Sequence, residues 1–510
     1  MPRFYAYPSR QGEPMPEPTP GSWVLRPEST DDDGLRTTFQ LRYVNASGAQ
    51  VAIGHVKILR TGQQASRTSL DATFDHLGPE YVSVGAELEY YKNLREVAGS
   101  EAVEVLLALA DAAIDPVRRA RFEAEAGFQN SLLRFTPARL ALEQAATIFG
   151  ASTSPPSSAS GPLIFRTSTG GDLFDVSFEM NLVPDLPGRI NVLVGSNGSG
   201  KTRLLSNLAL AAFAPADTDE ARSWGSFNAP LNFSRVLAFS YSALDDFDVP
   251  AVSGRERAAF LRADSGLGYM YFGLRDLTEG RAVQAPASAL KSVRQVRNEF
   301  QRAVKAAFDE DGPLFLKVLN RLFAEPSFAS IGVRPLATST EPRQLLERTF
   351  SHASTGHKFV LLMTAQLCGF VRDGSLVLID EPESHLHPPL LAAFVRVLRQ
   401  LLEAKDSHAI VATHSSYVVQ ETPSSYVRII RRAVNRTKVT PPSIETYGED
   451  IATITRDIFR LDSEGGDFVG VLEELAHRRT LAQLEALFPR GLSGQARAIV
   501  MAIQARRGRA

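Results

Sequence analysis

The sequence predicts an α/β protein in which a doubly wound parallel sheet is preceded by an α+β domain and followed by a short helical segment. Short apolar runs recur after residue 162 and end in small or polar residues: INVLVG, VLAFSY, LVLID and AIVATH. Such runs are typical of strands buried on both faces of a parallel sheet. Helical segments lie between them, as the crossovers of such a sheet require. Ligands of these sheets bind beyond the carboxyl ends of the strands, so the chemistry is expected there.

The α+β domain is expected over residues 1–150. Its first forty residues are rich in proline and acid, which predicts irregular structure. The stretch TTFQLRYVNASGAQVAIGHVKILR predicts two strands around an Asn-Ala-Ser-Gly turn. From about Val84 to Gly150 the apolar residues repeat with helical spacing. No motif in this domain indicates its role.

Three further boundaries follow from composition. The Ser/Pro/Gly-rich run GASTSPPSSASGP predicts a linker over 151–162. The sheet domain is expected over 163–450, with a charged helical insertion over about 254–346. Residues 451–510 are expected to form short helices.

Composition excludes several classes of protein. The chain has 510 residues and a net charge of -2, so overall charge gives no attraction to nucleic acid, although a local patch still could. One cysteine, Cys368, allows neither a disulfide framework nor a multi-thiolate metal site. The apolar stretch FVLLMTAQLCGFV is shorter than the roughly 18 residues of a membrane helix, and the N-terminus has no signal core. A cytoplasmic protein without membrane contact is therefore expected.

A phosphate-binding loop is the strongest motif. INVLVGSNGSGKT places G-x-x-x-x-G-K-[ST] between a buried strand and a helix, the context this loop requires. The glycines let backbone N–H groups surround phosphates, Lys201 brings a positive charge, and the Thr202 hydroxyl suits Mg²⁺. The loop consists of Gly195, Ser196, Asn197, Gly198, Ser199, Gly200, Lys201 and Thr202.

Two further strand ends carry candidate catalytic residues. Asp380 ends the run LVLID, where a carboxylate that supports Mg²⁺ belongs, and Glu381 follows it as a candidate base for the attacking water. His414 ends AIVATH and could hydrogen-bond the γ-phosphate. The ordinary alternatives are that Asp380 and Glu381 are merely solvated acids at a strand end and that His414 is a hydrogen-bonded polar residue without a catalytic role. The phosphate loop earlier in the chain argues against both.

A second anion site is predicted at a helix start. Ser354, Thr355 and Gly356 precede an apolar stripe at helical spacing, so backbone N–H groups there point outward. The stripe consists of Phe359, Leu362, Met363, Gln366, Leu367 and Phe370.

This order of motifs resembles the ABC-type ATPase superfamily over about residues 160–450. SHASTGHK is similar to the family signature, with Ser354 and Gly356 at its serine and glycine. The resemblance implies ATP and Mg²⁺ as cofactors, hydrolysis of ATP, and two nucleotides held between two protomers. The signature of one chain would then complete the site of its partner, in a homodimer or higher oligomer.

DEPESHLHP resembles the form found in RecF-like, SMC-like and OLD-like ATPases. On that resemblance His385 and His387 belong to a loop between subunits and are not a metal pair. Two departures stand out. His357 and Lys358 follow the signature glycine, and no glutamine occupies the expected Q-loop, where Ser240, Ser242 or Asp245 could substitute.

The remaining sequence narrows the choice among the RecF-like, SMC-like and OLD-like ATPases. About 150 residues separate Thr202 from Ser354, too few for an SMC-type arm, and residues 450–510 lack the D-x-D of a Toprim nuclease. The tail ETYGEDIATITRDIFRLD is similar to OLD-like ATPases of anti-phage operons, nearest to the ATPase of Septu systems. That resemblance implies a defence complex whose ATPase gates a separate effector, an HNH-type nuclease.

Two alternatives stay open. One is a RecF-like DNA-repair ATPase, for which the basic run RIIRRAVNRTK, the tail ARRGRA or the insertion could contact DNA. The other is a slow ATP-binding scaffold whose occupied state matters more than its turnover.

Overall fold

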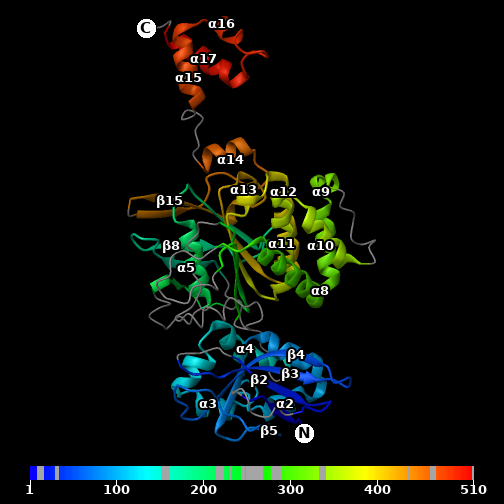
Figure 1. Ribbon diagram of the computed structural model, residues 1–510. Coiled ribbons are helices and arrows are strands. Elements are labelled where there is room, and N and C mark those ends of the chain that lie inside the picture. The colour runs from blue at the N-terminus through cyan, green and yellow to red at the C-terminus, as the bar shows by residue number, and fades with distance from the viewer. Residues whose placement is uncertain are drawn as a thin grey trace. The chain divides into compact units, whose positions relative to one another are not determined.

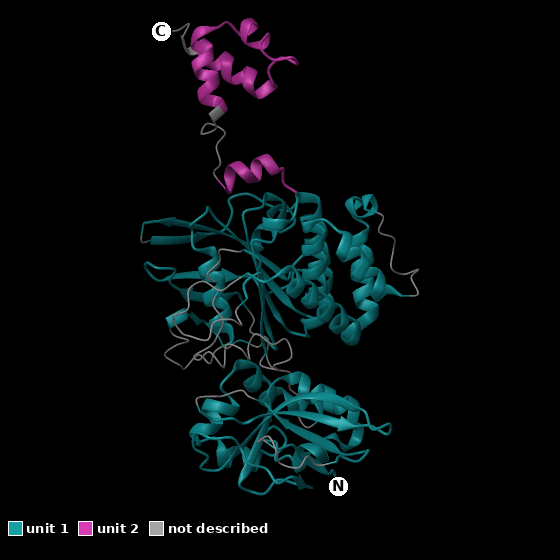
Figure 2. Ribbon diagram, in the orientation of Figure 1, with its two compact units in different colours: residues 1–447 teal, residues 448–510 magenta. Residues whose placement is uncertain are grey.

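The computed structural model describes residues 1–8, 17–28, 34–150, 161–213, 223–229, 231, 233–242, 247, 268–276, 290–331, 341–434, 436–459 and 467–507. They form two compact units, Met1–Tyr447 and Gly448–Ala510 (Figure 2). None of the described helices is both long and apolar enough to cross a membrane.

The N-terminal part of the first unit is a six-stranded sheet with helices. The strands lie in the order β5-β1-β2-β3-β4-β6. The predicted hairpin is confirmed: β3 pairs antiparallel with β4, and the Asn45 side chain holds the turn by accepting from the Ser47 and Ala49 amides. Strand bounds are β1 Phe4–Ala6, β2 Trp23–Pro27, β3 Thr38–Val44, β4 Gln50–Arg60, β5 Thr73–Phe74 and β6 Tyr81–Gly85.

The expectation of irregular structure in the first forty residues was wrong for the residues of β1 and β2. Residues of β1 and β2 are buried, and the two strands pair in parallel. The partners of β1 are distant in sequence, which a local pattern cannot reveal. The helices predicted between Val84 and Gly150 are present: α1 Leu88–Ala98, η1 Gly99–Glu101, α2 Ala102–Ala108, α3 Pro116–Phe122, η2 Phe128–Leu132 and α4 Thr136–Ile148.

The central element is a seven-stranded sheet in the order β12-β11-β13-β14-β9-β15-β16 (Figure 1). All neighbours pair in parallel except β15 and β16. The four apolar runs form buried strands here, as predicted. Strand bounds are β9 Ile190–Val194, β11 Val236–Ser240, β12 Tyr269–Gly273, β13 Leu376–Asp380, β14 His408–Thr413, β15 Val427–Ala433 and β16 Arg436–Thr440.

Helices cover both faces of this sheet, so the domain is doubly wound (Figure 1). α5 packs against alternate residues of the central strands, among them Ala238, Leu378 and Ala412. On the other face, Phe370 of α11 contacts Phe272 of β12, with ring centroids 5.4 Å apart. The helices are α5 Lys201–Phe213, α8 Val293–Phe323, α9 Pro326–Ser330, α10 Pro342–His352, α11 Thr355–Phe370, η4 Pro382–His385, α12 Pro388–Ala404, α13 Ser416–Gln420 and η5 Ser424–Tyr426.

Three details refine the predicted domain. The stretch 254–346, expected to be helical, also supplies the edge strand β12 before α8 begins. α11 is buried on nearly all sides, because α8 and α12 cover the face away from the sheet. A separate three-stranded sheet, β10-β7-β8, joins the domain, with bounds Ser226–Phe227, Leu163–Thr167 and Phe174–Phe178.

The second unit is helical, as expected of residues 451–510. Its small apolar core comprises Leu472, Ala476, Leu484, Leu492 and Val500. The helices are α14 Ile451–Asp457, α15 Asp467–Arg478, α16 Leu481–Glu485 and α17 Gly494–Arg507.

Candidate nucleotide-binding site

The phosphate loop connects β9 to α5, as the sequence predicts. Gly198 and Gly200 have φ of 75° and 91°, a region that side chains disfavour. A Cβ on Gly200 would also lie 2.9 Å from Thr169 Oγ1, and one on Gly195 would lie 2.5 Å from the Ile430 carbonyl oxygen. The tight turn therefore requires its glycines.

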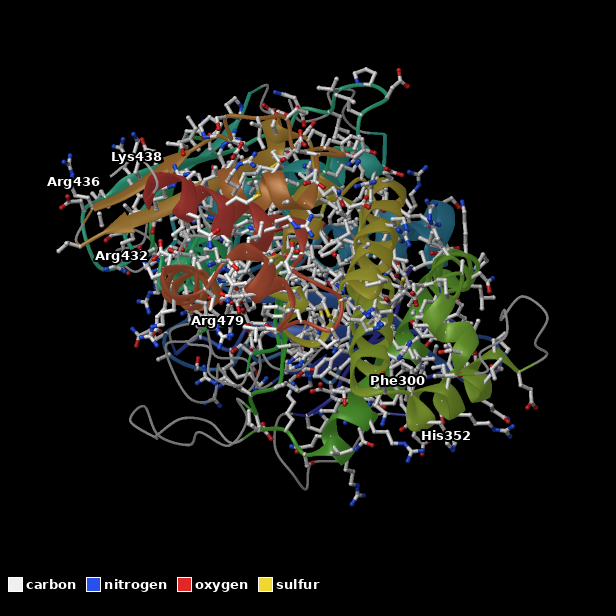
Figure 3. The ribbon with its side chains drawn as sticks, turned by 90° about the horizontal axis from the view of Figure 1, so that it is seen from above. Phe300, His352, Arg432, Arg436, Lys438 and Arg479 are labelled. Carbon is white, nitrogen blue, oxygen red and sulfur yellow. The ribbon has the colours of Figure 1, made fainter. Side chains whose placement is uncertain are left out.

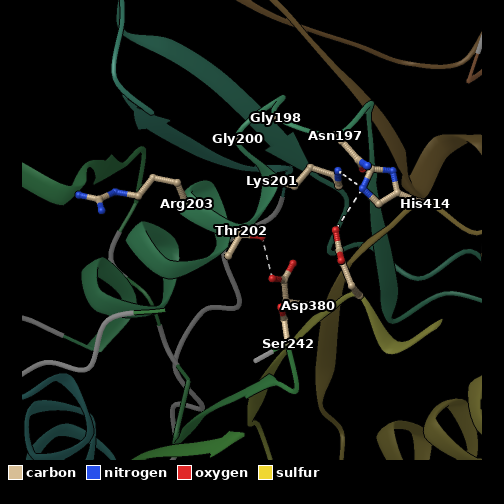
Figure 4. Close-up of a pocket in the computed structure, with 10 residues that line it drawn as sticks. Asn197, Gly198, Gly200, Lys201, Thr202, Arg203, Ser242, Asp380 and His414 are labelled. Atoms are coloured by element: carbon tan, nitrogen blue, oxygen red, sulfur yellow. Dashed lines mark hydrogen bonds and ion pairs between the residues drawn. The ribbon is translucent and has the colours of Figure 1, made fainter. Parts of the chain in front are cut away.

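A pocket of about 440 Å³ opens beside this loop (Figure 4). Its walls come from the loop, the start of α5, and the ends of β11, β13 and β14, so it lies at the carboxyl ends of the parallel strands. The lining residues are Asn197, Gly198, Gly200, Lys201, Thr202, Arg203, Ser242, Asp380, Glu381 and His414.

Lys201 is buried in this pocket and bound on two sides. Its Nζ donates to the Gly195 carbonyl at 3.0 Å and lies 2.8 Å from His414 Nε2. Burial lowers the pKa of Lys201, and the acids Glu381, Asp380 and Glu383 raise it in opposition. The loop carbonyl holds the ammonium, beside His414, where phosphate oxygens would otherwise meet it.

Thr202 and Asp380 meet across the pocket. The Thr202 hydroxyl donates to Asp380 Oδ2 at 2.8 Å, although the residues lie on α5 and β13 (Figure 4). A hydroxyl and a carboxylate are hard oxygen donors, the type Mg²⁺ prefers, and Mg²⁺ usually takes few protein ligands beside substrate phosphates. These two side chains therefore fit the predicted magnesium ion.

Glu381 occupies a left-handed backbone conformation, with φ of 47°. Its amide donates to the Ala412 carbonyl at 2.8 Å, which fixes the residue between two strand ends. Its Oε1 lies 3.1 Å from His414 Nε2. The hydrogen bond from His414 lowers the pKa of Glu381 against the effect of burial, so the carboxylate is ionised near neutral pH and can accept a proton.

His414 Nε2 thus lies between the phosphate-loop lysine and the candidate base, and as a single donor or acceptor it hydrogen-bonds Glu381 or Lys201 but not both at once. The backbone amide of His414 donates to Glu383. Glu383 received no role in the sequence analysis, although it is the second acid of the quoted D-E-P-E. Burial raises its pKa. It acts as a support that positions the His414 backbone.

The signature residues lie apart from this pocket. Ser354 caps α11 and is exposed, and neither it nor Gly356 is among the described residues that line the pocket. A Cβ on Gly356 would lie 2.9 Å from the His385 carbonyl oxygen, so the glycine lets the helix start approach the loop after β13.

The Q-loop candidates differ in position. Ser242 lines the pocket, whereas Ser240 is buried within β11. Asp245 lies outside the described residues. Arg203 is a lining residue that the sequence analysis missed, and its place directly after the G-K-T motif was the available signal.

His385 and His387 contact protein groups. The His385 ring stacks on Phe359 with centroids 4.0 Å apart, and its Nε2 lies 3.0 Å from the Tyr241 carbonyl oxygen. His387 precedes α12. Across the described ranges, no three His, Cys, Asp or Glu side chains are grouped to hold a metal ion. Cys368 is buried.

Residues 233–420 match the family described as "AAA domain, putative AbiEii toxin, Type IV TA system". This match runs from just before β11 to α13 and includes the signature, Asp380, Glu381 and His414. These residues, somewhat more than a third of the chain, resemble that AAA family. The doubly wound parallel sheet with a phosphate loop after β9 is the one the sequence predicted.

Known proteins resemble larger parts of the chain. Protein ea59 of Escherichia phage lambda is 28% identical over 481 residues, covering 88% of each chain. An ATP-binding cassette of an ABC transporter in its ADP conformation covers 58% of this chain and 95% of its own, with 14% identity and a TM-score of 0.30. The SMC head domain from Thermotoga maritima covers 56% and 98%, with 13% identity and a TM-score of 0.28.

Proposed function

We propose that the protein is a Mg²⁺-dependent ATP-hydrolysing switch whose two nucleotide sites close when two copies associate. One observation carries the proposal: Lys201, His414 and Glu381 form a continuous chain of contacts beside the Thr202–Asp380 pair in a single pocket. These are the groups that phosphoryl transfer to water requires: a phosphate cation, oxygen ligands for the metal, and a base.

The expected chemistry follows from these positions. Lys201 would exchange the Gly195 carbonyl and His414 for oxygens of the β- and γ-phosphates. Thr202 and Asp380 would hold Mg²⁺, which supplies positive charge at those phosphates. Glu381 would orient a water whose oxygen bonds to the γ-phosphorus while the bond to the β–γ bridging oxygen breaks. The water's proton passes to Glu381, and ADP leaves with the electron pair. His414, released from Lys201, would hydrogen-bond the γ-phosphate.

The placement of the signature supports association of two copies. Ser354 is exposed and Gly356 is partly exposed at a helix start whose outward N–H groups suit an anion. Neither lines the pocket of its own chain. In the proposed arrangement, they contact the γ-phosphate bound by the partner subunit.

The Glu381→Gln variant tests this proposal. The amide keeps the side-chain volume but cannot accept the proton, so turnover is expected to fall at least about 10²-fold while ATP still binds. With ATP and Mg²⁺, sedimentation velocity is expected to show a stable dimer. Glu403→Gln, on the exposed side of α12, is the matched control and should retain turnover. A Glu381→Gln protein that binds ATP and stays monomeric would contradict the sandwich and favour the scaffold alternative.

We infer an anti-phage defence complex with a separate HNH-type nuclease as the setting of this switch. The matched family is described as "putative AbiEii toxin, Type IV TA system", a toxin–antitoxin system, which supports a role in a system that acts on a host cell or a phage. Because the relative ea59 is a phage protein, two roles for this protein stay open: defence of the host, or a step in the life cycle of a phage. Co-expression with the neighbouring gene, followed by phage plating, distinguishes them. Protection that requires both an adjacent nuclease gene and Lys201 supports the inference; absence of an effector gene contradicts it.

One surface favours the alternative of direct DNA binding. Arg431 lies directly opposite Lys438 in the β15–β16 pair, and Arg436 lies beside them on the same face at the sheet edge (Figure 3). Arg436 and Lys438 are exposed, so their positive charges can attract an anionic partner. The Arg436→Ala/Lys438→Ala variant is expected to reduce both DNA affinity and its salt dependence if DNA binds here. Turnover that DNA leaves unchanged would count against this alternative.

A further inference from the structure

The first turn of α11 contains a chain of hydrogen bonds that the proposed phosphate chemistry does not use. Ser354 Oγ lies 2.7 Å from His357 Nδ1. The opposite ring nitrogen, Nε2, lies 2.9 Å from Ser327 Oγ, and Ser327 in turn donates to the Glu325 carboxylate. The chain runs from an exposed serine to a buried acid 29 residues earlier, whose side chain also accepts from the Ser327 amide.

Packing fixes the imidazole at the centre of this chain. His357 is 6% exposed, and the Phe328 ring meets it edge-on with centroids 4.6 Å apart. Ser354 itself is exposed, so a fixed histidine lies behind an accessible hydroxyl. The histidine therefore controls the direction of the serine's single proton.

The positions of the protons follow from the donors available. Ser327 gives its only hydroxyl proton to Glu325, so its oxygen can only accept from His357, and Nε2 carries a proton. In neutral His357 the other nitrogen, Nδ1, is bare and accepts the Ser354 proton. In protonated His357, Nδ1 donates to Ser354 Oγ, and the serine proton turns outward.

We propose that His357 is the positioning residue of the signature serine and that its protonation turns Ser354 into a hydrogen-bond donor toward the partner subunit's ATP. This inference rests on the proposed two-copy site. A phosphate oxygen only accepts hydrogen bonds, so it meets a lone pair of Ser354 when His357 is neutral and a donor when His357 is charged. Closure of two ATP-bound heads therefore takes up one proton at each site.

The sign of the pH dependence follows from the groups around His357. In a free head, burial lowers the pKa of His357, Glu325 raises it and His387 lowers it further. Further titratable groups on the adjoining segments include Lys358 on α11, Glu383 and His385 before α12, and Arg343, Glu347, Arg348 and His352 on α10. The partner's γ-phosphate adds negative charge across Ser354 and raises the pKa of His357 in the dimer. Dimer stability from this source is present at low pH and is lost as pH rises through that higher value.

The test is the dimer dissociation constant of full-length Glu381→Gln with ATP and Mg²⁺, measured by sedimentation between about pH 5.5 and 8.5. It is expected to rise with pH by up to about tenfold per unit at each site. Adding His357→Asn places a permanent amide donor near the Nδ1 position, so this rise should disappear while tight association persists. Adding His352→Gln instead, at an exposed histidine whose Nδ1 lies 2.9 Å from the Arg348 carbonyl oxygen, should leave the rise intact (Figure 3).

Two outcomes overturn the inference separately from the proposed function. An equal pH dependence with and without His357→Asn would show that another group, such as ATP itself, causes it. Ser327→Ala gives a second test that spares Ser354: loss of the acceptor behind Nε2 should lower the pKa of His357 and move the profile to lower pH. An unchanged pH profile of dimer dissociation would contradict the series of hydrogen bonds from Glu325 to Ser354. If the parent binds ATP without dimerising at any pH, the two-copy site fails, and this inference fails with it.

Discussion

The two helix starts that face nucleotide in the proposed mechanism differ in how complete they are within one chain. At the start of α5, Lys201 is 4% exposed and contacts loop carbonyls and His414, while Thr202 contacts Asp380. At the start of α11, Ser354 is held from behind by His357, and its outer side is exposed.

This difference teaches that one chain supplies the catalytic groups of the proposed site, whereas the outer side of that site would come from the start of α11 in a second copy. The groups around Lys201 come from three strand ends and one helix, and they contact one another within a single chain. Because these groups act on the reacting phosphate in the proposed mechanism, removing one of them should affect the chemical step. The start of α11 offers donors without an anion of its own, and its removal should affect association.

Lys201→Ala should have the largest effect. Among the described residues that line the pocket it removes the single lysine and, with it, the group that lies between His414 and the phosphate loop. Turnover is expected to fall at least about 10³-fold, and nucleotide affinity should fall with it. A coupled assay of phosphate release and a titration with a fluorescent ATP analogue measure the two effects. Retained turnover would mean that the pocket is not the hydrolytic site.

Ser354→Arg should reduce turnover about 10²-fold by placing charge and bulk at the exposed helix start while leaving the pocket intact. The decisive measurement mixes this variant with Lys201→Ala. If each site draws on two chains, random pairing restores about a quarter of the wild-type sites, because half of the dimers carry one intact site of two. Two inactive variants that stay inactive when mixed would contradict the shared site.

Most of the nucleotide site at the start of α5 could be predicted from the sequence. G-x-x-x-x-G-K-[ST] and three buried strand ends are local patterns, and a parallel sheet brings such ends together wherever they occur in the chain. Asp380, Glu381 and His414 therefore meet the loop as predicted. Ser242, by contrast, is one of three Q-loop candidates that the sequence left equal, and only its place on the pocket wall separates it from Ser240.

Long-range contacts explain what the sequence could not supply. Ser327 reaches His357 from a helix 30 residues earlier, and no spacing rule predicts that pairing. Strand β1 is three residues long and depends on partners in β2 and β5. Strand β12 lies inside a charged stretch and is recognised as a strand only by its pairing with β11.

His414→Ala should have an intermediate effect. It removes the bridge between Lys201 and Glu381, and with it the hydrogen bond that lowers the pKa of Glu381. A base that is less fully ionised and less well oriented should slow turnover by about 10- to 100-fold with little change in ATP affinity. His385→Ala, at a ring that stacks on Phe359 instead, is the matched control. A loss of affinity equal to the loss of turnover would make His414 a binding group.

Gly356→Ala should have the smallest effect and tests how closely the start of α11 must approach the loop after Glu381. The added Cβ would lie 2.9 Å from the His385 carbonyl oxygen, so either the helix or the loop must shift by a few tenths of an ångström. Because this displacement reaches Ser354 and leaves the phosphate loop untouched, we expect an ATP-dependent dimer about three- to tenfold weaker with nucleotide binding unchanged. Gly470→Ala, at a glycine of α15 where an added Cβ would meet nothing within 4 Å, is the matched control and should associate like the parent. A Gly356→Ala protein that dimerises normally would show that the signature contact tolerates this movement, and that its precision comes from the histidine behind the serine and not from the glycine beside it.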